Sequence, residues 1–128
     1  MKDAVFYLGL GVLFTHELDA LPNHEWRVLP LVRSLPDDVG MAVFVALHVP
    51  LFAVLVALVA SARPRVRRLS RIGIATFLIV HALMHRLFTD HPSYEFSSRL
   101  SEWLIFGGAA LGAAYLAMEL FDRRTPAR

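Results

Sequence analysis

Histidines and carboxylates are the residues of this 128-residue sequence that could do chemistry, and their spacing predicts a metal site. His81 and His85 lie one turn apart on a helix, so both imidazoles can address one point. His16 and Asp19, three residues apart, also share a helix face. Imidazole and carboxylate suit zinc, iron, copper or manganese, and the absence of cysteine excludes thiolate sites.

Four further residues extend this predicted site. His48 is followed closely by Pro50, and a proline kink beside a histidine can tilt its ring toward a bundle axis, so we include His48 among the candidate ligands. Glu17 points about 100° away from the preceding histidine around a helix, which suits a catalytic base better than a ligand of the same ion. Arg86 and Glu102 are expected to pair with each other beside the site.

The elements that must position these residues are apolar segments long enough to cross a membrane. Hydrophobic residues make up 56% of the sequence, and the charges are segregated between long apolar runs. A helix needs about 20 mostly apolar residues to cross the hydrocarbon core. The sequence therefore predicts one all-α domain over residues 1–128, an integral membrane four-helix transmembrane bundle with spans at about 4–21, 39–60, 69–88 and 98–121. The first span could instead be a signal peptide, but no A-x-A cleavage site follows it.

Arginines predict how this bundle is oriented. The loop between the second and third spans is rich in arginine, and short loops of this kind stay in the cytoplasm. The basic tail at residues 122–128 agrees, so both termini are predicted to be cytoplasmic, in a multi-pass protein of the bacterial-type inner membrane. In this orientation the outer half of the bilayer holds the ionisable residues of the spans: His16, Asp19, His48, His81, His85 and Glu102.

Simpler interpretations of the same residues stay open. A lone transmembrane histidine such as His48 often only hydrogen-bonds a neighbouring helix. His24 and His91 lie in predicted loops beside acids and prolines, where a solvated surface is expected. Gly108 and Gly112 allow close helix approach, which serves packing within one chain or a homo-oligomer equally well.

The run from His16 to Ala20, followed by the other three span histidines, resembles small bacterial membrane proteins of unknown role, including the family named for an HXXEE motif. Asp19 and Ala20 stand where that motif has two glutamates. A looser similarity is to membrane hydrolases of the alkaline ceramidase type. That similarity implies zinc held by histidines, one pair spaced as His81 and His85 are, together with an aspartate.

Three functions fit these observations. The first is a metal-dependent membrane enzyme, with zinc ahead of iron or copper and hydrolysis ahead of redox chemistry, acting on a membrane lipid or other apolar substrate. The second is a b-type haem protein, with His48 facing His81 or His85 as axial ligands. The third is a non-enzymatic membrane subunit or metal carrier. A formal net charge of only +2 gives no reason to expect a nucleic-acid partner.

The predicted topology can be tested with reporter fusions. A reporter after Arg128 and one inserted near Arg67 are expected to read cytoplasmic, because arginine-rich short loops are retained on that side. A reporter between Asp90 and Tyr94 is expected to read external. Finding the Arg67 and Asp90 reporters on the same side of the membrane would contradict the four-span arrangement.

Overall fold

The computed structural model describes the backbone of residues 1–124 and the side chains of residues 1–122. These residues form four α-helices and one short 3-10 helix, with no strand among them, which confirms the all-α prediction. The elements are α1 (Lys2–Ala20), η1 (Glu25–Arg27), α2 (Asp37–Val59), α3 (Pro64–Phe88) and α4 (Arg99–Arg124). Most of the basic tail lies outside the described residues.

Local chemistry explains where the helices begin. α2 starts directly after Pro36, with Asp37 and Asp38 in its first turn, where carboxylates favour the positive end of the helix dipole. α3 starts at Pro64, five residues before the predicted span, because proline suits the first helical position. Before α4, the Ser98 hydroxyl accepts a hydrogen bond from the Ser101 backbone N–H at 3.0 Å, as a helix cap does.

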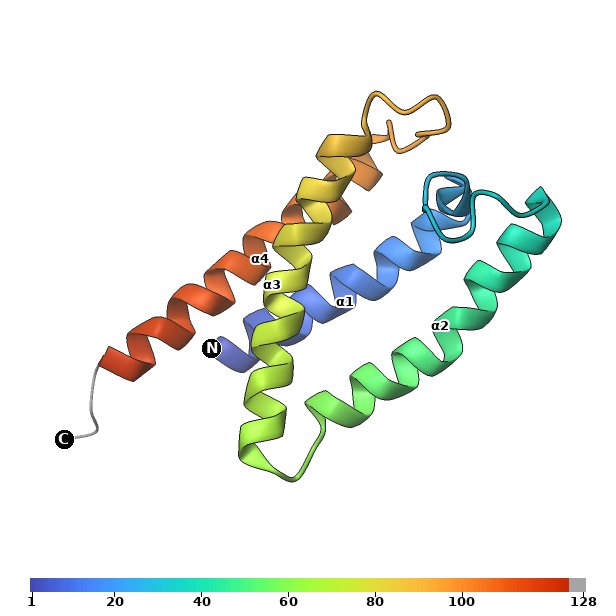
Figure 1. The fold of residues 1–128 in the computed structure, drawn as a ribbon. Helices are drawn as coiled ribbons and strands as arrows, with labels where there is room; N and C mark the ends of the chain where they lie inside the picture. Colours follow the sequence, from blue (N-terminus) through green and yellow to red (C-terminus); the bar gives the residue numbers. More distant parts are fainter. Residues whose placement is uncertain (125–128) are drawn as a thin grey trace.

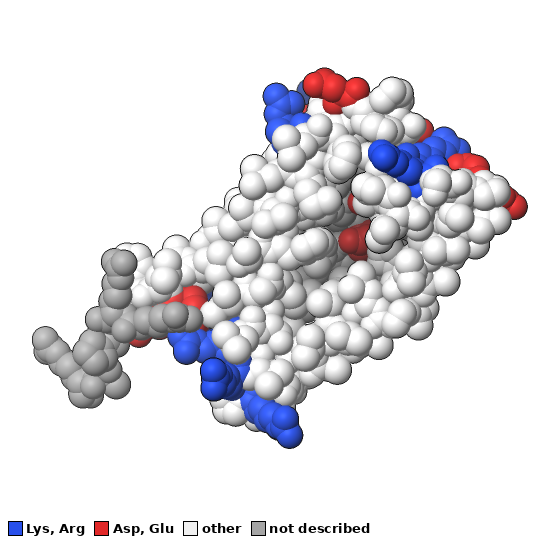
Figure 2. Space-filling model, in the orientation of Figure 1, with Lys and Arg blue, Asp and Glu red and all other residues white. Residues whose placement is uncertain are grey.

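Three of the four α-helices, α2, α3 and α4, are long and apolar enough to cross a membrane. α1 is not among them, because its 19 residues include Lys2, Asp3, Glu17 and Asp19. Figure 2 shows charged atoms gathered mainly toward two ends of the molecule, with a largely uncharged surface between them. The structure thus supports a membrane protein, and the role of α1 as a fourth span stays a prediction.

The main core joins α1, α3 and α4, and α2 stands partly apart from it (Figure 1). Phe6, Leu10, Leu78 and Tyr115 belong to one buried cluster that these three helices mainly supply and to which α2 adds Val59. Only 11% of an apolar 18-residue stretch of α2 is buried, compared with 28% of the corresponding stretches of α3 and α4. α2 therefore leaves space along its inner side, and most of its apolar surface is free to contact lipid.

A second buried cluster closes one end of the bundle. The segment between α1 and α2 folds over the helices and buries Trp26 and Val32 against Phe44 of α2. Phe96, from the connection between α3 and α4, joins the same cluster. Both connections at this end therefore carry apolar side chains into the protein, and this is the end where the predicted chemistry lies.

Gly108 and Gly112 of α4 face the inside of this chain. A Cβ atom at Gly112 would lie 2.5 Å from the carbonyl oxygen of Ala75 in α3, and one at Gly108 would lie 3.3 Å from Val12 in α1. These close approaches account for the small residues within a single chain, and the homo-oligomer through this face stays a prediction.

Replacing Gly112 by alanine is expected to destabilise the bundle by about 1–3 kcal/mol, because the new methyl group meets α3 backbone that cannot move aside easily. Gly73→Ala is the matched control, since a Cβ atom there meets nothing within 4 Å. Thermal unfolding of the detergent-solubilised protein measures both variants. Equal melting temperatures for the two would contradict the tight α3–α4 contact.

Candidate metal site

Three segments bring four side chains with metal-binding atoms together at one end of the bundle. His16 comes from α1, Glu25 from η1, and His81 and His85 from α3. One possible ligand atom from each residue lies within 4.8 Å of those of the other three. His16 is 1% exposed and His85 is 5% exposed, so the group lies inside the protein.

Glu25 reaches this group because the segment between α1 and α2 folds back. His24, with φ at 48°, takes the left-handed conformation that turns the chain. The Trp26 indole N–H donates to the Asp37 carboxylate at 3.0 Å, and the Arg27 guanidinium donates to both oxygens of that carboxylate at 2.7 and 2.8 Å. These bonds fix the loop on the start of α2 and hold Glu25 against the bundle.

The spacing of the four side chains suits a small cation. Nε2 of His81 and Nε2 of His85 are 3.1 Å apart, and Nε2 of His16 lies 3.8 Å from Oε2 of Glu25. Ligand atoms around a tetrahedral zinc ion, at 2.0–2.1 Å from the metal, are about 3.3 Å from one another. Small side-chain rotations would therefore bring all four atoms to coordinating distance.

Two members of this group, His16 and Glu25, have side-chain atoms without a hydrogen-bond partner in the described part of the chain. Both ring nitrogens of His16 and Oε2 of Glu25 are buried without one. A buried polar atom left unpaired costs about 1–3 kcal/mol. A cation between the side chains would accept lone pairs from His16 and Glu25 and so remove much of that cost.

The electrostatic surroundings of Glu25 also favour a bound cation. Burial, together with the nearby carboxylates of Glu17 and Asp19, raises the pKa of Glu25 to about 8. The structure thus gathers three acids where water is scarce, and a positive ion would stabilise their charged forms.

Aromatic neighbours orient the histidines. Nδ1 of His85 lies 3.2 Å from the Tyr94 hydroxyl, so an Nδ1–H donor there leaves Nε2 free to bind a metal. The ring of His81 stacks on Phe77 with centroids 5.3 Å apart, and Phe96 packs against the rings of both His16 and His85. These contacts limit ring rotation.

A second polar pair lies next to the four-residue group. The Glu17 carboxylate is 2.8 Å from Nε2 of His48, whose Nδ1–H donates to the Phe44 carbonyl at 2.7 Å. Glu17 and His48 line the same cavity of about 500 Å³ as Glu25, His81 and His85. The rest of its lining is largely apolar, and Figure 2 shows acidic atoms at the bottom of a hollow in an uncharged surface.

The other predicted site residues lie outside the four-residue group. The buried Oδ2 of Asp19 has no hydrogen-bond partner among the described residues, and its carboxylate is not one of the four donors. Arg86 and Glu102 are exposed, and no ion pair joins them in the described chain. His24 pairs with Glu95 at 2.9 Å, and His91 accepts a hydrogen bond from the Ser93 backbone.

Sequence reasoning missed Glu25, because it looked for acids within the predicted spans. A usable signal lies beside it: Trp26, Val28 and Val32 are apolar residues in a short loop, and each is buried at 4–6% exposure. Burying them requires the loop to fold onto the bundle, which carries Glu25 inward.

The chain matches the model of a family of unknown function (DUF6713) over residues 2–122, so it belongs to that family. Comparison with curated proteins and comparison with solved structures each gave no match. The expectation of a small family of unknown role is thereby confirmed, and the resemblances to the HXXEE family and to alkaline ceramidases stay predictions.

His16→Leu separates metal binding from packing. In metal-free protein the variant is expected to be more stable than the parent by about 1–3 kcal/mol, because two buried, unpaired nitrogens are replaced by apolar atoms. With zinc present the order should reverse, since only the parent gains binding energy. Melting temperatures with chelator and with zinc test this. A variant less stable than the parent under both conditions would contradict it.

Proposed function

We propose that this member of the DUF6713 family is a four-span membrane protein with cytoplasmic termini that holds one divalent transition metal through His16, Glu25, His81 and His85, and uses it in hydrolysis. The observation that carries the proposal is the convergence of four donor atoms within 4.8 Å, with buried atoms of His16 and Glu25 that have no hydrogen-bond partner among the described residues. In the proposed orientation the site lies toward the outer leaflet.

The donor set favours zinc. Three imidazoles and one carboxylate, with no thiolate, suit zinc more than the softer metals, and zinc accepts four ligands without a strong geometric demand. Glu25 takes the place that sequence reasoning gave to Asp19 or His48. A haem is less well supported, because both ring nitrogens of its expected axial ligand His48 are engaged, Nδ1 with the Phe44 carbonyl at 2.7 Å and Nε2 with Glu17 at 2.8 Å.

Glu17 and His48 supply the remaining chemistry. A bound zinc ion that kept a position open beside its protein ligands would polarise a carbonyl group and lower the pKa of water. The Glu17 carboxylate, fixed by the imidazole of His48 at 2.8 Å, would accept a proton from water entering the cavity. The two side chains can share one proton between Oε2 and Nε2, which allows the pair to return it to a leaving group.

The cavity supports a lipid or other apolar substrate. Val28, Leu29, Leu51 and Met84 are among its apolar lining residues, and the polar groups lie together at one part of the wall. Since α2 is packed loosely against the other helices, a substrate can enter from the membrane between α2 and α3. The ligand types also resemble those of ceramidase-type hydrolases, which supports hydrolysis over redox chemistry.

Metal content tests the proposal. Protein purified without chelator is expected to carry about one zinc ion per chain, and removing one ligand should abolish most of it. His85→Ala and Glu25→Gln should both lose the metal, whereas His91→Ala, in the adjoining loop, should keep it. Elemental analysis of the folded proteins measures this. A metal-free parent, or a Glu25→Gln variant that binds as well as the parent, would refute the ligand set.

Glu17→Gln separates an enzyme from a metal carrier. The variant is expected to keep its zinc, because Glu17 is not one of the four donors, and to lose hydrolysis of a lipid ester or amide by at least about 100-fold, as loss of a general base does. The comparison needs a panel of fluorogenic lipids and the zinc-loaded parent. Unchanged hydrolysis in the variant would exclude the base, and no hydrolysis by the zinc-loaded parent would favour a carrier.

A further inference from the structure

A second cavity, of about 810 Å³, lies at the opposite end of the bundle from the four-residue group. Its wall is formed by the first turns of α1 and α3, the end of α2 and the last turns of α4. Phe14 and Phe52, with ring centroids 4.5 Å apart, join α1 to α2 between the two cavities. Neither the metal site nor the proposed hydrolysis uses this space.

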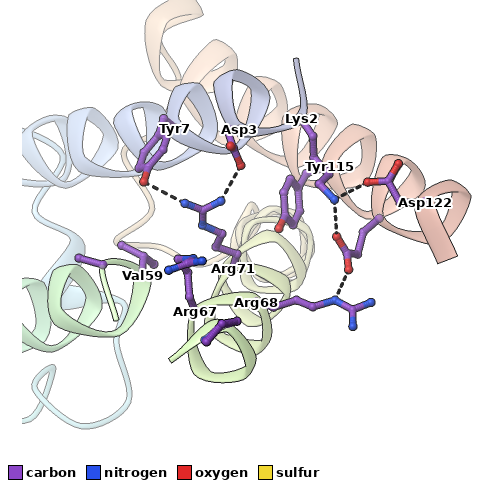
Figure 3. A pocket seen from close by; sticks show the side chains of 12 residues that line it. Lys2, Asp3, Tyr7, Val59, Arg67, Arg68, Arg71, Tyr115 and Asp122 are labelled. Carbon is purple, nitrogen blue, oxygen red and sulfur yellow. Dashed lines mark hydrogen bonds and ion pairs between the residues drawn. The ribbon is translucent and has the colours of Figure 1, made fainter. Parts of the chain in front are cut away.

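Most of the charges in this cavity compensate one another (Figure 3). Lys2 binds Glu119 at 2.9 Å and also Asp122, and Arg68 binds Glu119 as well. Arg71 donates to Asp3 at 2.6 Å and to the Tyr7 hydroxyl at 3.0 Å. These pairs tie the ends of α1, α3 and α4 together.

Arg67 is the exception. Its guanidinium donates to the Ser61 carbonyl at 3.0 Å, and no described carboxylate pairs with it. Arg71 lies one turn further along α3, borders the same cavity, and has a buried Nε without an acceptor. An anion in the cavity would compensate the charge of Arg67, and Arg71, although it is paired with Asp3, would add a second positive group one turn away.

The surroundings add positive potential. Arg63 and Arg65 are exposed just outside the cavity and also have no acidic partner among the described residues. Pro64, the first residue of α3, borders the cavity, so the positive end of the α3 dipole lies at this opening. Val59 and Ala60, at the end of α2, supply an apolar edge to the same opening.

We propose that this cavity binds a phosphate group through Arg67 and Arg71. The site lies at the arginine-rich start of α3, beside the end of α2, so in the proposed orientation it meets the headgroup layer of the inner leaflet. The phosphate can therefore come from an anionic phospholipid of the inner leaflet or from a small soluble phosphate. The apolar edge at Val59 favours the phospholipid, since an acyl chain can continue along α2.

The test uses delipidated, full-length protein in neutral detergent at physiological salt. Binding of short-chain phosphatidylglycerol, phosphatidylcholine, glycerol phosphate and inorganic phosphate is followed through the melting temperature and by native mass spectrometry. The parent is expected to prefer phosphatidylglycerol over phosphatidylcholine. Binding of the soluble phosphates as tightly as phosphatidylglycerol would assign the site to a soluble phosphate; failure of every probe would overturn the proposal.

Two single-charge variants distinguish a built site from general surface charge. Arg67→Gln should weaken phosphatidylglycerol binding at least tenfold, as loss of a charged hydrogen bond does. Arg65→Gln removes the same charge from an exposed position outside the cavity and should cost at most about fivefold. Equal losses in the two variants would overturn the proposal.

A third variant tests the same cavity without removing any of its arginines. Ala60 is exposed, so Ala60→Asp should leave the fold intact while placing a carboxylate at the cavity wall. It should compete with phosphate for the arginines and reduce binding to the level of Arg67→Gln. Unreduced phosphatidylglycerol binding by a folded Ala60→Asp protein would place the lipid elsewhere and overturn the proposal.

Discussion

The cost of burying polar atoms is the constraint on which the rest of this structure depends. His16 is almost fully enclosed by other side chains, and neither of its ring nitrogens has a hydrogen-bond partner in the described chain. The neighbours that a histidine would normally use are two more histidines and a buried carboxylate. The proposed cation would offset this cost by accepting lone pairs from His16 and Glu25 in a low-dielectric interior. The folded-back loop, the Tyr94 contact and the aromatic packing all serve to keep these atoms in place.

The partly detached position of α2 follows from the same arrangement. α1, α3 and α4 supply most of the main core, to which α2 adds Val59, and α2 is held elsewhere by the Glu17–His48 pair, the Phe14–Phe52 contact and the Trp26 loop. The cavity of about 500 Å³ borders α2 around His48, and the cavity of about 810 Å³ borders its end at Val59. The loose packing of α2 beside the first cavity supports the proposed entry of a substrate from the membrane.

The sequence was most informative where periodicity applies. The helices lie close to the predicted spans, and the His81–His85 spacing predicted a pair that the structure places with Nε2 atoms 3.1 Å apart. It could not place Glu25, because a loop has no period and its path depends on burying Trp26 against Phe44. The sequence also could not predict that His48 pairs with Glu17, because that contact depends on how far α2 stands from the core. Contacts between segments, and not the local helix preferences of the sequence, determine where Glu25 and His48 lie.

The charged residues of α1 bear on its proposed role as a fourth span. Its four charged residues exclude it from the helices that are apolar enough to span, yet three of them are compensated within the protein: Lys2 by Glu119, Asp3 by Arg71, and Glu17 by His48. An ion pair held by other helices lowers the cost of a charge in the membrane, because the charge is never exposed to lipid alone. The fourth charge, Asp19, lies next to the proposed cation. The charged residues of α1 thus lie at its two ends, beside the two proposed binding sites. Their pairing within the protein supports α1 as the proposed fourth span.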